Sequence, residues 1–133
     1  MTAPACADAV RRVVHAQCGV EFANFLADKL RMDQTKQRSV LFYDIRGGLL
    51  PAKKAVLKAK EHLPGDLAKK ASSLSRSVTK LLARHEGPGK VPAAGLPKFR
   101  QDVEKLQRDF HAFLQEIRKG CGAAPEPPVG ERR

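Results

Sequence analysis

The residues of this chain that could do chemistry include four histidines, three cysteines and twenty-five lysines and arginines. None of the histidines (His15, His62, His85 and His111) has a second histidine at the i+3 or i+4 spacing of a helical metal site. There is no GxSxG elbow, and the glycines before Lys90 lack the spacing of a phosphate-binding loop. We therefore expect no catalytic residue, no metal and no cofactor, and a binding protein that takes no small-molecule substrate.

The three cysteines, Cys6, Cys18 and Cys121, are an odd number and include no CxxC pair. Their spacing predicts neither a zinc site nor a disulfide framework. The first fourteen residues lack the apolar stretch of a secretory signal. These features favour an intracellular, reducing compartment, either cytoplasm or nucleus, with the mitochondrial matrix left open. Cys18 is expected to be a small buried apolar residue.

The basic residues are concentrated in the middle of the chain, which has a formal net charge of +11. Residues 1–33 carry four basic and four acidic residues, and residues 101–133 carry six of each. The entire excess therefore lies in residues 34–100, with fifteen basic residues against four acidic ones. A basic middle between neutral ends indicates a surface for an anionic partner. The alternative is a solvated helical face that has no partner.

The elements that would carry these residues are helices. The chain has 133 residues, enough for one domain, and only 5% of them are aromatic. Leucine, valine, alanine and six phenylalanines must therefore build the core, which favours helix packing over a sheet sandwich. No run of about 20 apolar residues predicts a membrane span.

The first half of the chain predicts three helices. The first begins at or before Asp8 and ends near Leu30, with one apolar stripe. The second ends in residues 40–45, which could also form a short strand, and Gly47-Gly48 is expected to break the chain. The third begins at Pro51 and ends near His62. The stripe of the first helix comprises Val10, Val13, Val14, Cys18, Phe22, Phe25, Leu26 and Leu30.

The fourth predicted helix, residues 67–85, has a clear apolar face and a basic opposite face. Asp66 is its expected N-cap. If it packs against the preceding helix as an antiparallel hairpin, the lysines of both helices form one surface for the anionic partner. That surface comprises Lys53, Lys54, Lys58, Lys69, Lys70, Arg76, Lys80 and Arg84.

The last predicted helix, residues 98–119, follows a Pro/Gly-rich linker at residues 86–97 and has an apolar heptad seam. The residue before three seam positions is acidic: Asp102, Asp109 and Glu116. This acidic edge is expected to pack beside a basic helix, in this chain or in another. The seam, which could dock another helix, comprises Phe99, Val103, Leu106, Phe110, Phe113 and Ile117.

Together these features predict an all-α protein, an irregular bundle of four or five helices in a single domain over residues 1–119. A flexible Pro/Gly-rich tail is expected over residues 120–133. The function expected is that of a non-catalytic adaptor in a larger assembly, bound mainly to protein. Two alternatives are an accessory protein that binds RNA or DNA backbones through residues 53–84, and a peripheral binder of anionic membranes.

Overall fold

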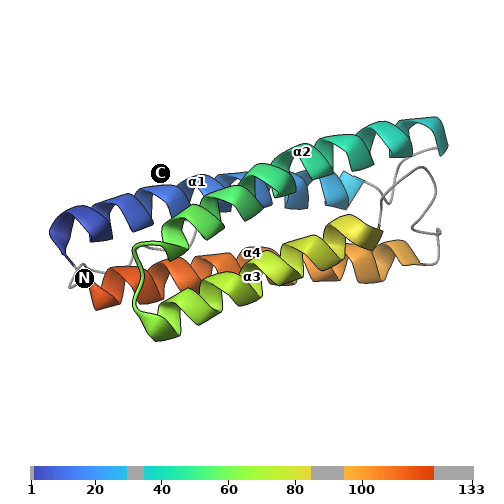
Figure 1. Ribbon diagram of the computed structural model, residues 1–133. Helices are drawn as coiled ribbons and strands as arrows, with labels where there is room; N and C mark the ends of the chain where they lie inside the picture. Colours follow the sequence, from blue (N-terminus) through green and yellow to red (C-terminus); the bar gives the residue numbers. More distant parts are fainter. Residues whose placement is uncertain (1, 30–34, 85–94, 122–133) are drawn as a thin grey trace.

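The computed structural model describes residues 2–29, 35–84 and 95–121; for residues 35–40 and 84 it describes only the backbone. Within these ranges the chain forms four helices and no strand: α1 (Ala3–Lys29), α2 (Thr35–Lys60), α3 (Gly65–Arg84) and α4 (Leu96–Gly120). Successive helices run antiparallel, and α1 and α2 lie above α3 and α4 (Figure 1). Each helix packs against the next, and α4 packs against α1. The predicted all-α helical bundle is confirmed.

The core face of α1 differs from the predicted stripe, because its smallest residues lie inside. Val13 and Leu26 are buried as predicted, but Cys18, Phe22 and Phe25 are exposed. Alanines fill the interior instead, which lets α1 approach its neighbours closely. Leu30 lies outside the described residues. The buried residues of α1 are Ala9, Val13, Ala16, Gln17, Val20, Ala23, Leu26 and Ala27.

The predicted chain break at Gly47-Gly48 is wrong, because α2 continues through both glycines and through Pro51. A Cβ on Gly48 would stand 2.6 Å from the carbonyl oxygen of Gly19, and a Cβ on Gly19 would stand 2.5 Å from that of Gly48. The two glycines therefore let the backbones of α1 and α2 touch. Pro51 has no N–H to donate to the carbonyl of Gly47, but Gly47 is exposed, so water can satisfy that group.

The second half of the chain folds closely as predicted. Helix α3 begins at Gly65 and not after Asp66, so Asp66 lies in the first turn, where its charge favours the helix N-terminus. Helix α4 begins at Leu96, with Pro97 in its first turn. The rest of the predicted linker, residues 86–94, lies outside the described residues. Every residue of the heptad seam is buried, at 3% exposure or less.

A disulfide joins Cys6, near the start of α1, to Cys121, directly after α4. Their Cα atoms are 6.1 Å apart although 115 positions separate them in sequence, and this distance is normal for a disulfide. The expectation that the cysteines form no disulfide is therefore wrong, because antiparallel packing brings the start of α1 and the end of α4 to one end of the bundle. Such bonds persist in oxidising compartments, which argues against the expected reducing one. The predicted tail beyond Cys121 lies outside the described residues.

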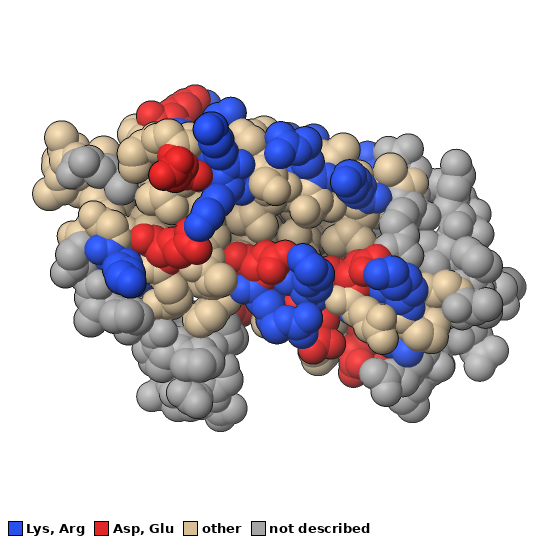
Figure 2. Space-filling view, turned by 90° about the horizontal axis from the view of Figure 1, so that it is seen from below, with Lys and Arg blue, Asp and Glu red and all other residues tan. Residues whose placement is uncertain are grey.

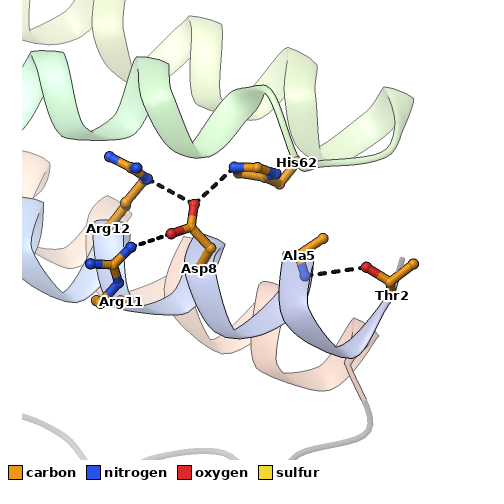
Figure 3. Close-up of polar contacts among 6 residues, drawn as sticks. All are labelled: Thr2, Ala5, Asp8, Arg11, Arg12 and His62. Carbon is orange, nitrogen blue, oxygen red and sulfur yellow. Dashed lines mark hydrogen bonds and ion pairs between the residues drawn. The ribbon is translucent and has the colours of Figure 1, made fainter.

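Polar contacts at this end of the bundle gather on Asp8 (Figure 3). Its carboxylate accepts hydrogen bonds from Arg12, at 2.8 Å, and from Arg11. It also lies 2.8 Å from Nε2 of His62, in the turn between α2 and α3. The hydrogen bonds from Arg12 and Arg11 lower the pKa of Asp8 from 3.8 to about 2. One turn earlier, Thr2 caps α1 by accepting a hydrogen bond from the amide of Ala5.

Among the helices described above, none has the length and apolar character needed to cross a membrane.

Candidate interface for an anionic partner

The excess positive charge lies on two adjacent helices. Helix α2 contains seven basic residues and one acidic residue, and α3 contains five and one, a net charge of +10 out of the +11 of the whole chain. Helix α1 contains three of each, and α4 contains six basic and four acidic residues. Because α2 and α3 pack against each other, the two helices that carry this charge lie side by side in the bundle.

The cations of α4 are largely neutralised by their own helix. Lys98 pairs with Asp102, Lys105 with Asp109 and Arg108 with Glu104, each at 2.9 Å and each four residues apart. In Figure 2 acidic and basic side chains accordingly alternate along the lower row, whereas basic side chains dominate the band above it. The three α4 ion pairs are exposed, and such pairs contribute little to stability. Their effect is to remove net charge from this helix.

Two of the predicted surface residues on α3 face α4 and its acidic edge. Lys70 forms an ion pair with Glu116 at 2.5 Å. Lys80 lines a groove between α3 and α4 together with Asp102 and Asp109. The acidic edge of the last helix therefore lies beside the basic helix of the same chain. Carboxylates of α4 therefore neutralise part of the positive charge on α3.

On its other side, α3 forms a shallow groove with α2 that holds three cations. Lys60, Lys69 and Arg76 line it together with Ala68 and Ser72, around a volume of about 400 Å³. None of these three cations has a carboxylate partner among the described residues. Ser72 adds a half-buried hydroxyl, which can donate to an oxygen of the partner. We call this set the α2–α3 basic groove.

The remaining predicted residues lie on α2 or at the end of α3. Lys53 is half-buried, whereas Lys54 and Lys58 are exposed. The side chain of Arg84 lies outside what the structure describes. The predicted surface is therefore divided: Lys69 and Arg76 meet in the groove, and Lys70 and Lys80 face α4. Lys60 was missed, although it lies seven residues after Lys53 and so shares its face of the helix.

No set of three or more His, Cys, Asp or Glu side chains that could hold a metal ion occurs in the described part of the chain. His15 is exposed, His62 contacts Asp8, and His111 lies 3.4 Å from the buried amide of Gln17. His85 lies outside the described residues. The heptad seam is enclosed by the bundle, so in this structure it offers no surface to a second chain.

Comparisons with models of known protein families, with curated proteins and with solved structures found no match to this chain.

Proposed function

We propose that this protein is a non-catalytic adaptor that docks an anionic partner in the α2–α3 basic groove. One observation carries the proposal: the three groove cations have no carboxylate partner among the described residues, whereas three cations of α4 are paired within their own helix. Unpaired cations gathered in a concave site attract and orient a partner of opposite charge. The heptad seam of α4 does not take part in docking the partner, because it belongs to the core of the bundle.

The test compares two triple variants that remove the same charge from different places. Lys60→Ala/Lys69→Ala/Arg76→Ala empties the groove. Lys98→Ala/Lys105→Ala/Arg108→Ala is the matched control, because it removes three positive charges that are already paired. Binding of fluorescent poly-glutamate, single-stranded RNA and duplex DNA is measured by anisotropy over a range of salt concentrations.

We expect the groove variant to bind the best of these ligands at least fivefold more weakly. Three exposed charge contacts of about 0.3 to 0.5 kcal/mol each give a factor of about five to thirteen. The control variant should change affinity less than twofold. Equal losses in the two variants would show that net charge alone attracts the ligand. Binding that is insensitive to salt would also refute the proposal, because screening must weaken contacts between exposed charges.

The same groove makes an accessory role on RNA or DNA the second candidate. Phosphate oxygens are natural acceptors for lysine and arginine. If the partner is a duplex, each lost phosphate contact should lower the slope of log affinity against log salt by about 0.9. Tighter binding of nucleic acid than of poly-glutamate, with a slope lowered by about 2 to 3 in the groove variant, would favour this candidate.

A further inference from the structure

The solvent face of α2 carries a line of large apolar side chains. Tyr43 is 76% exposed and Leu57 is 39% exposed, and Leu50 lies half-buried midway between them. A spacing of seven residues places all three on one stripe of the helix, about 21 Å long. Exposed apolar residues that stand singly are ordinary, but two exposed ones with a half-buried leucine midway, all at heptad spacing, are what a helix presents to the apolar stripe of a partner helix. We call these three residues the α2 apolar line.

Basic residues flank this line on both sides. Arg46, Lys53 and Lys60 follow the three apolar residues by three positions each, so they form a parallel row one step around the helix. Lys60 lies in the α2–α3 basic groove with Lys69 and Arg76, which places this row on the side of α2 nearest α3. Lys54 is exposed and lies on the other flank. An apolar line between cationic flanks matches a helix that has an apolar stripe and acidic flanks.

We propose that the partner's docking element is an acidic amphipathic helix, which lies along the α2 apolar line and places its carboxylates over the α2–α3 basic groove. This inference rests on the proposed function and names the partner. Fifteen residues, 43–57, span the line, so a helix of about 15 to 18 residues is sufficient. Leucines have no role in contacting a phosphate backbone, so the line favours a protein partner over nucleic acid.

A second copy of this chain is a poorer occupant. The acidic edge of α4, formed by Asp102, Asp109 and Glu116, already lies along α3 in the same chain, where Glu116 pairs with Lys70. A second copy would have to open its own bundle to offer this edge. The partner helix therefore comes from another protein.

The probes are two acetylated, amidated 18-residue peptides of identical composition, rich in leucine and glutamate. The stripe peptide places leucines at alternating steps of three and four with glutamates on both flanks; the scrambled peptide has no stripe.

Each peptide is titrated by anisotropy against the full-length protein and three variants. The variants are Tyr43→Ser/Leu57→Ser, Phe25→Ser and the groove triple variant. Phe25→Ser is the matched control, because Phe25 is 60% exposed but lies on α1. Far-UV circular dichroism checks that every variant is folded.

We expect the stripe peptide to bind the unmodified protein at least tenfold more tightly than the scrambled peptide. Tyr43→Ser/Leu57→Ser should lose about tenfold for the stripe peptide, whereas Phe25→Ser should lose less than twofold. Loss of the exposed apolar side chains is not expected to unfold the protein, since neither belongs to its core.

Three outcomes would overturn the inference. In the first, both peptides bind equally, and the Tyr43→Ser/Leu57→Ser variant keeps full affinity while the groove variant loses affinity. The proposed function then stands, but the α2 apolar line has no part in it. In the second, RNA binds more tightly than the stripe peptide, and the partner is a nucleic acid. In the third, the groove variant binds every anionic probe as well as the unmodified protein, and the proposed function fails as well.

Discussion

Replacing Gly48 with alanine tests the closest contact in the bundle. An alanine in the interior of a helix normally stabilises it by about 1 kcal/mol relative to glycine. At position 48 the added Cβ would stand 2.6 Å from the backbone oxygen of Gly19, well inside the 3.0 Å that real Cβ contacts keep. Backbone cannot rotate away as a flexible side chain can, so α1 and α2 must move apart.

The size of the effect follows from two opposing terms. Overpacking of this kind costs about 1 to 3 kcal/mol, and a backbone obstacle places the cost near the upper end of that range. After the gain in helix propensity, we expect Gly48→Ala to lower the free energy of unfolding by about 2 kcal/mol. Gly47→Ala is the matched control: Gly47 lies in the same helix, but a Cβ there would meet nothing within 4 Å. It should raise the free energy of unfolding by about 1 kcal/mol.

Urea denaturation followed by far-UV circular dichroism measures the free energy of unfolding of both variants. In thermal denaturation, their melting temperatures should differ by roughly 10 °C. Gly19→Ala should resemble Gly48→Ala. The double variant should lose less than the sum of the two single losses, because the helices separate only once. If Gly48→Ala stabilises the protein as much as Gly47→Ala does, the two helices do not touch at this point and the reasoning is refuted.

Three further predictions concern single sites. Because the pKa of Asp8 is held at about 2, its stabilising effect is complete above about pH 4 and disappears as the pH falls through 2. Asp8→Asn should therefore lower the melting temperature at neutral pH and much less at pH 2, and an equal deficit at both pH values would contradict this. Removing the bond between Cys6 and Cys121 by serine substitution at both should cost up to roughly 5 kcal/mol, given the length of the closed loop. Thiol titration of the unreduced, denatured protein should find one thiol, that of Cys18, and three would show that the bond is absent. Phe99→Ala should cost about 3 to 5 kcal/mol in urea denaturation, since Phe99 is fully buried, and a loss below 1 kcal/mol would place it outside the core.

The second half of the fold was predictable because its pattern depends on large side chains. In residues 67–85 and 98–119, leucine, valine and phenylalanine recur at steps of three and four, which is the spacing of one helical face. Leu74, Val78, Phe99 and Phe110 accordingly lie in the core. Length, period and burial agree here, so the expected helices match α3 and α4 closely.

The first half was less predictable because it is built on small residues. Ala16 and Ala23 are weak signals of burial in a sequence, and Phe22 is a strong one, yet the alanines are buried and Phe22 is exposed. A pair of adjacent glycines usually indicates a turn. Only the position of Gly19 across the interface makes Gly48 a packing residue, and this pairing of distant residues is not visible in a local pattern.

The candidate site was predicted in its charge but not in its geometry. The basic middle of the chain did point to α2 and α3. The neighbouring helices decide which lysines are paired with a carboxylate. Lys70 was predicted for the surface but pairs with Glu116. Lys60 was not predicted but lies in the groove. The sequence pattern does not reveal the α2 apolar line, because Gly47-Gly48 predicts a break that separates Tyr43 from Leu57. Once α2 is one continuous helix, their common stripe follows from spacing alone.

The disulfide between Cys6 and Cys121 also decides how the protein responds to a pulling force. Tension applied outside the two cysteines enters at one of them and leaves at the other, so the covalent bond carries the load and the chain between them carries none. When the bond is reduced, the helices stand in series in the path of the force. The 115 positions between the cysteines could then extend to roughly 400 Å, at about 3.5 Å per residue. With the bond formed, the chain between Cys6 and Cys121 is shielded from the force; with the bond reduced, the force can extend it.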